Sequence, residues 1–146
     1  MWTWGPRLTV NRGDLRKLAQ LRLAEAALLA ASGRRSGAYY LAGYAIECGL
    51  KACVAKQFKR SEFPDKRMVN DSYTHDLVKL VRLAGLEADL ATTAAADPVF
   101  ETYWAVTKDW SEDSRYTFSS ELKTRDLLEA ISEPNHGILR WIKTKW

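Results

Sequence analysis

Apolar residues recur along most of this chain at the three- and four-residue steps of an amphipathic helix. The first such stripe consists of Leu15, Leu18, Leu21, Ala24 or Glu25, and Leu28. No segment alternates apolar and polar residues over a useful length, so no strand is predicted. The pattern therefore predicts an all-helical protein, an up-and-down antiparallel bundle of four to five main helices with shorter ones between them.

Capping residues set the expected helix boundaries. Ser32 and Gly33 end the first helix, and Pro134 separates the last two. N-terminal caps are predicted at Ser36, Thr74, Asp97 and either Ser119 or Ser120. We expect helices over residues 14–31, 36–58, 74–85, 97–110, 119–131 and 138–146. Residues 59–71 are expected to form a basic, turn-rich loop, and residues 86–96 a loose turn or a helix.

The composition is that of an ordinary globular domain. The chain has 146 residues, of which 47% are hydrophobic and 27% charged, so disordered and fibrous classes are excluded. We expect one domain over residues 1–146, with residues 1–12 as a loosely ordered leader. Cys48 and Cys53 are interpreted as small buried hydrophobic residues of a reducing compartment. With no signal peptide or membrane-length apolar run, the predicted location is cytoplasmic.

Charge is distributed unevenly between the two halves of the chain. Residues 1–60 hold 11 Lys and Arg against 3 Asp and Glu, whereas residues 61–146 hold 11 against 15. A basic half of this kind can face phosphate groups, an acidic partner or the acidic half of the same chain. The charge pattern alone leaves these possibilities open.

A stripe of four residues marks the second helix as the chain's candidate functional element. Tyr40, Tyr44, Glu47 and Lys51 follow one another at steps of four, three and four, so they share one face. Glu47 and Lys51 can simply pair with each other on a half-exposed helix. Alternatively, the guanidinium of Arg115 docks onto Glu47, in either a structural or a ligand-facing role.

The two histidines and the acidic loop also have alternative interpretations. His75 is either an exposed residue at a helix start or a general acid or base. His136 is expected to be a turn residue. Asp109, Glu112 and Asp113 form an acidic cluster, which we interpret as a solvated loop, so no metal ligand and no cofactor is predicted.

Four segments resemble motifs of the HEPN domains of prokaryotes. Residues 37–52, GAYYLAGYAIECGLKA, are similar to the signature helix of that family, and residues 73–77, YTHDL, to its short helix start. Residues 109–116, DWSEDSRY, resemble its tryptophan-to-Arg-Tyr segment, and residues 136–143, HGILRWIK, fit its ending. The resemblance runs from about Asp14 to Trp146.

The resemblance implies a helical bundle that forms a homodimer. Members of the family include ribonuclease toxins, nucleotide-binding modules and partners of small nucleotidyltransferases in toxin–antitoxin operons. In the ribonuclease members an arginine precedes a histidine by four to six intervening residues. This chain departs from that pattern, because seven residues separate Arg67 from His75 and ten separate Arg125 from His136.

The sequence thus favours an RNA- or nucleotide-binding component of a toxin–antitoxin or defence module. Two alternatives are a divergent, metal-independent endoribonuclease and a helical scaffold that binds a minimal nucleotidyltransferase. If the chain is an enzyme, His75 and Arg115 are the candidate catalytic pair. The candidate ligand-binding residues are Glu47, Lys51, Tyr116 and Tyr40. In this interpretation Arg115 contacts phosphate or locks onto Glu47, Lys51 adds positive potential, and Tyr116 stacks or hydrogen-bonds.

Overall fold

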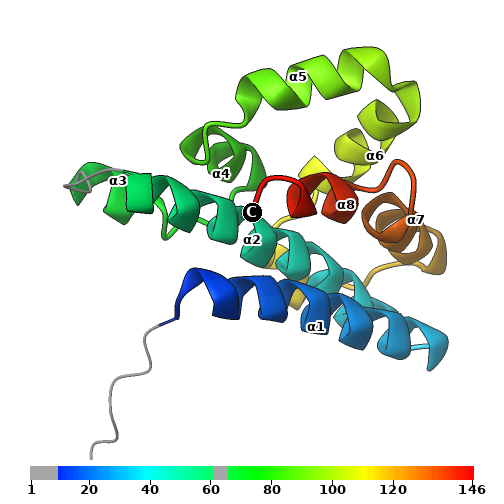
Figure 1. Ribbon diagram of the computed structural model, residues 1–146. Coiled ribbons are helices and arrows are strands. Elements are labelled where there is room, and N and C mark those ends of the chain that lie inside the picture. The colour runs from blue at the N-terminus through cyan, green and yellow to red at the C-terminus, as the bar shows by residue number, and fades with distance from the viewer. Residues whose placement is uncertain (1–9, 61–65) are drawn as a thin grey trace, which may run out of the picture.

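The fold is all-helical, as the periodicity predicts. The computed structural model describes residues 10–60 and 66–146, and this part contains eight α-helices, one 3₁₀ turn and no strand. The elements are α1 (Arg12–Ala31), α2 (Arg35–Arg60), α3 (Lys66–Asp71), α4 (Leu77–Leu83), α5 (Glu87–Ala96), α6 (Pro98–Lys108), η1 (Glu112–Tyr116), α7 (Glu121–Ser132) and α8 (Ile138–Lys143) (Figure 1). The predicted leader falls largely on residues 1–9, which lie outside the described residues.

Helix α2 is the central element of the fold. It packs against α1, α4, η1, α7 and α8. A short connection, in which Gly33 adopts a φ of 75°, joins α1 to α2, and the two helices run antiparallel along each other (Figure 1). Helices α4, α5 and α6 form an arch at the top of the view, above α2 and α8 (Figure 1). Any side chain that faces inward from the middle of α2 is therefore surrounded by several other elements.

Small residues allow the neighbours of α2 to approach its backbone closely. A Cβ added to Gly43 would lie 2.2 Å from atoms of the Trp110 ring, and one added to Gly49 would lie 3.1 Å from Ile142. Four alanines on the face of α2 that carries Gly49 are completely buried, namely Ala38, Ala42, Ala45 and Ala52. Trp110 thus packs directly on the helix backbone, one turn before Glu47.

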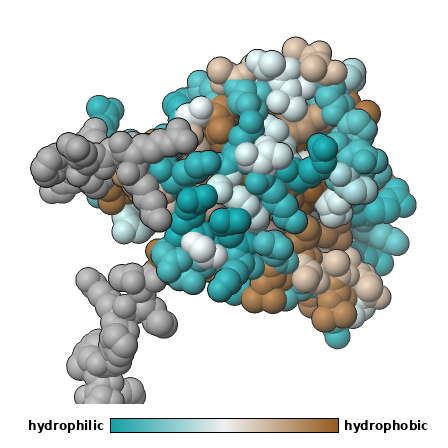
Figure 2. All heavy atoms as spheres, in the orientation of Figure 1, coloured by the Kyte–Doolittle hydropathy of each residue, from teal (hydrophilic) through white to brown (hydrophobic). Residues whose placement is uncertain are grey.

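The second half of the predicted stripe on α1 is wrong. The completely buried residues of α1 are Ala19 and Ala26, whereas Leu21 is 52% exposed and Leu28 69% exposed. Since α1 packs against the small residues of α2, alanines fit at the close contact and the bulkier leucines lie outside it. Figure 2 accordingly shows hydrophobic side chains on the surface over the C-terminal half of α1.

Two predicted caps are confirmed and two are wrong. Asp97 accepts hydrogen bonds from the first amides of α6, and Ser120 caps α7 through the Lys123 amide. Ser36 instead lies inside α2, where its hydroxyl accepts from the Ser119 amide. The cap of α4 is Asp76 rather than Thr74. The Thr74 hydroxyl oxygen accepts a hydrogen bond from the Asp76 amide, which lies before the helix.

Two further boundaries differ from expectation, while a third agrees with it. The predicted basic loop contains a helix, α3. Residues 87–96 form a regular helix, α5, which is one of the two expected alternatives, although none of its residues is buried. Helix α6 ends at Lys108, so Trp110 lies beyond the helix instead of on its apolar face. This early end turns the chain across α2 and leads it into η1.

We predict that Gly43→Ala lowers the free energy of unfolding by about 1–3 kcal/mol, as overpacking of a core does. Alanine is the better helix former, but its Cβ would overlap the Trp110 ring. Urea unfolding followed by circular dichroism measures the effect. Gly37→Ala is the matched control, because its Cβ meets only Leu29 Cδ1, at 3.4 Å, and the substitution should stabilise the protein by up to about 0.5–1 kcal/mol. Equal effects of the two substitutions would contradict the packing argument.

Candidate functional site

A buried carboxylate in the middle of α2 is the starting point of the candidate site. Glu47 is 2% exposed, and both of its oxygens have partners. Its Oε2 lies 3.2 Å from Nζ of Lys51, and its Oε1 lies 2.8 Å from Nδ1 of His75. Because an unpaired buried charge is costly, Glu47 requires such partners in the folded protein.

His75 reaches Glu47 because it lies just outside a helix. Asp76 is the cap of α4, so the residue before it has left the helical path and its side chain is directed towards α2. The imidazole remains 43% exposed, and its second nitrogen, Nε2, lies 3.1 Å from Oε2 of Glu112. His75 thus connects the core of α2 to the 3₁₀ turn η1.

The same carboxylate oxygen of Glu112 also lies 3.8 Å from a guanidinium nitrogen of Arg115. Five charged side chains therefore form a continuous series, which we call the charged row: Lys51, Glu47, His75, Glu112 and Arg115. The fold brings together His75 and Arg115, which are 40 positions apart in the sequence. Both side chains contact the same carboxylate oxygen, Oε2 of Glu112.

Both ring nitrogens of His75 lie within hydrogen-bonding distance of a carboxylate. A neutral imidazole has one N–H and can donate to only one of the two carboxylates, whereas the imidazolium can donate to both. The buried Glu47 fixes the ring through Nδ1 and leaves Nε2 directed towards η1. A histidine oriented in this way by a carboxylate is the usual arrangement of a general acid or base.

Of the two alternatives expected for Glu47, the pair with Lys51 is present and the contact with Arg115 is not. His75 occupies the position expected for Arg115, and Arg115 pairs with Glu112. Tyr40 is half-buried and stacks on Tyr44 and Trp110, with ring centroids 6.0 and 6.1 Å away, so it belongs to the aromatic packing beside α2 and is not a member of the row. Tyr116 is 78% exposed, and its ring centroid lies 5.2 Å from the Arg115 guanidinium.

Glu112 is the member of the row that sequence reasoning missed as a functional residue. The sequence shows it only as part of the acidic cluster of Asp109, Glu112 and Asp113. In the structure this cluster lines a cleft of about 500 Å³, together with His75 and Lys108. In the described part of the chain, no three His, Cys, Asp or Glu side chains converge as a metal site requires. The signal available in the sequence was the spacing of Glu112 and Arg115 on one short turn.

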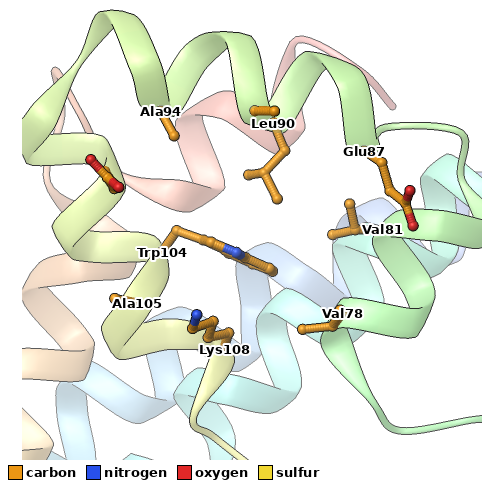
Figure 3. A pocket seen from close by; sticks show the side chains of 10 residues that line it. Val78, Val81, Glu87, Leu90, Ala94, Trp104, Ala105 and Lys108 are labelled. Atoms are coloured by element: carbon orange, nitrogen blue, oxygen red, sulfur yellow. The ribbon is translucent and has the colours of Figure 1, made fainter.

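A second cavity, of about 350 Å³, lies between α4, α5 and α6 (Figure 3). Figure 3 shows the Trp104 ring across its middle, with Leu90 on one side and Val78 and Val81 on another. Its lining is mostly aliphatic, with charges only from Glu87, Glu101 and Lys108. Such a lining offers little to orient a polar ligand, so this cavity is not the candidate site.

The remaining histidine and the cysteines have structural roles. His136 Nδ1 lies 2.6 Å from Oδ2 of Asp97, and this hydrogen bond lowers the pKa of the Asp97 carboxyl. His136 thus secures the capping residue of α6 and is more than the turn residue predicted. Cys48 and Cys53 are free and buried, as predicted, and burial raises the pKa of each thiol to about 11. Neither is therefore activated as a nucleophile.

Comparison of the chain with models of protein families, with curated protein sequences and with solved structures gives no match. Its function is therefore inferred from its own residues and geometry. Among residues 10–60 and 66–146, no helix combines the length and the apolar character that crossing a bilayer requires.

We predict that Glu47→Gln loosens His75 and leaves His136 unchanged. The substitution keeps the size of the side chain but removes the charge that strengthens the bond to Nδ1, and should lower the free energy of unfolding by about 1.5–3 kcal/mol. The chain has two histidines, so long-range ¹H–¹⁵N spectra of the imidazoles report on each separately. The His75 nitrogen shifts should change while those of His136 remain.

Asp97→Asn is the matched control, because it weakens the other histidine–carboxylate bond and should move only the His136 signals. Unchanged His75 signals in the Glu47→Gln protein would show that Glu47 does not orient the ring.

Proposed function

We propose that this chain is a HEPN-type helical protein that acts on RNA, and that a phosphodiester binds between His75 and Arg115. The supporting observation is that one carboxylate oxygen of Glu112 already lies 3.1 Å from His75 Nε2 and 3.8 Å from the Arg115 guanidinium. A phosphate oxygen in that place would meet the same two donors. Arginine suits this role because its planar fork matches phosphate.

The orientation of His75 favours cleavage over binding alone. In the proposed reaction the 2′-hydroxyl of the RNA gives its proton to a water molecule as its oxygen attacks phosphorus, a 2′,3′-cyclic phosphate forms, and the bond from phosphorus to the 5′ oxygen breaks. The imidazolium of His75 donates its Nε2 proton to the leaving 5′ oxygen, while Glu47 stabilises the ring through Nδ1. Arg115 offsets the negative charge that grows on the phosphate, and no metal ion takes part in these steps.

Glu112 has to leave before a phosphate can enter. It is 38% exposed and belongs to a five-residue 3₁₀ turn, so its side chain can swing into solvent without disturbing a long helix. In the structure Glu112 thus blocks the site it helps to form. The resting protein is accordingly expected to have low activity, as suits a component of a toxin–antitoxin or defence module.

We predict that the purified protein cleaves single-stranded RNA in the presence of a chelator and that His75→Ala and Arg115→Ala each reduce the rate at least about 100-fold. This loss is the usual contribution of a positioned acid or a charge-stabilising group. Product formation is measured on denaturing gels, with circular dichroism to verify that each variant is folded. Glu112→Ala should instead raise the affinity and the rate, because it removes the competing carboxylate.

Glu121→Ala is the control for Glu112→Ala, since it deletes an exposed carboxylate that pairs with Arg35 outside the row. It should leave the rate unchanged. RNA that stays intact with every protein, but binds with an affinity that falls steeply with salt, would mean recognition without turnover. RNA that neither binds nor breaks would contradict the proposal and favour the scaffold alternative.

We also propose that the protein forms a homodimer through α1. Four exposed positions of this helix lie three or four residues apart, at Leu21, Ala24, Leu28 and Ala31. A hollow of about 640 Å³ adjoins the end of this stripe at Ala31, and its other lining residues come from the end of α1, from α7 and from the connection into α2. An apolar stripe next to a hollow is what a second copy of a helix can fill.

We predict that Leu28→Glu shifts the protein from dimer to monomer, because it places a charge in the centre of this stripe. Sedimentation velocity at several concentrations measures the change. Val99→Glu is the control, because Val99 is also exposed but belongs to α6. A wild-type protein that sediments as a monomer, or a dimer that both variants retain, would rule out this interface.

A further inference from the structure

Two aromatic rings outside the core follow Arg115 in a single short segment. Tyr116 is 78% exposed and Phe118 is 101% exposed, while Phe100 and the described tryptophans are buried. Single exposed apolar residues are common on protein surfaces and need no explanation. Two large rings within three residues, directly beside a candidate phosphate-binding arginine, are a more specific feature.

The segment that carries these rings is fixed at both ends. The Thr117 amide donates to the Ser114 carbonyl oxygen, and the Ser119 amide donates to the Ser36 hydroxyl on α2. Thr117, between the two aromatic residues, is extended, with φ −121° and ψ 156°. An extended residue holds the Cα atoms on either side of it about 7 Å apart, so the backbone spaces Tyr116 and Phe118 by about that distance.

Positive charge accompanies the rings. The guanidinium of Arg115 lies 5.2 Å from the Tyr116 ring centroid. Lys123 belongs to the first turn of α7, five positions after Phe118 in the sequence. Exposed rings on a fixed backbone next to cations are the components of sites for single-stranded nucleic acids. An aliphatic ligand would gain nothing from these cations.

We propose that Tyr116 and Phe118 form a base-stacking site for two unpaired nucleobases. This inference rests on the proposed function, because the strand is the one whose phosphate binds between His75 and Arg115. Arg115 lies between the two parts and can contact phosphate on one side while it stacks on Tyr116 on the other. The rings form a narrow strip between charged residues, far smaller than the roughly 1,200 Å² that a stable protein interface buries in total.

Fluorescence anisotropy with three labelled probes tests the proposal: a single-stranded oligoribonucleotide that cannot be cleaved because its 2′-hydroxyls are methylated, the same backbone with abasic sites, and a duplex. Phe118→Ala and Tyr116→Ala should each weaken binding of the single strand about five- to 100-fold, as loss of one stacked base does. Neither should alter binding of the abasic strand. Phe118→Trp should retain the affinity, and Leu122→Ala, a nearby exposed apolar residue, should leave it unchanged.

Equal losses for the intact and abasic strands, or no loss from Phe118→Ala, would overturn the stacking site while leaving the phosphate site intact. Failure of the proposed function has a different signature, in which His75→Ala and Arg115→Ala bind the abasic strand as well as the wild type does. A wild-type protein that binds no single strand would overturn both. If Phe118→Ala dissociates a dimer of the protein, the rings bind a second copy of the chain and the stacking site is rejected.

Discussion

The buried carboxylate of Glu47 is the constraint on which the rest of the structure depends. Helix α2 is surrounded by other elements at this position and Glu47 is only 2% exposed, so pairing by the protein offsets most of the cost of burying the charge. Lys51, one turn along the same helix, satisfies one oxygen. The other oxygen requires a donor from elsewhere, and His75 supplies it. This bond ties the connection before α4 to α2 and, through Glu112, ties η1 to both.

Close packing gives the charged row its support. Because Gly43 has no side chain, Trp110 packs on the backbone of α2, and Tyr40 stacks against it on the same helix face. The position of Trp110 in turn sets where η1 begins, two residues later, and hence where Glu112 and Arg115 lie. The position of the charged row thus depends on the packing of the aromatic rings, and that packing depends on the glycine. A change at Gly43 would reach the site through the path of the backbone.

Much of the fold, but less of the site, could be predicted from the sequence. The helical class and the caps at Asp97 and Ser120 follow from local signals, which depend only on neighbouring residues. The stripe of Tyr40, Glu47 and Lys51 was likewise visible. The second partner of Glu47 could not be predicted. His75 contacts Glu47 because α4 is capped by Asp76, whereas the sequence predicts the cap two positions earlier, at Thr74. The leucines of α1 were misplaced because helical periodicity does not reveal how closely α1 and α2 approach each other.

The charged row divides into a fixed part and a part that can move, and this division is what favours a ligand site over a structural salt bridge. Glu47 and Lys51 belong to a long helix, and Glu47 orients His75 whether or not a ligand is present. Glu112 and Arg115 belong to a short turn and are 38% and 45% exposed, so their mutual pairing contributes at most about 1 kcal/mol. In the proposed function an incoming anion would therefore replace weak contacts and meet an imidazole that is already aligned.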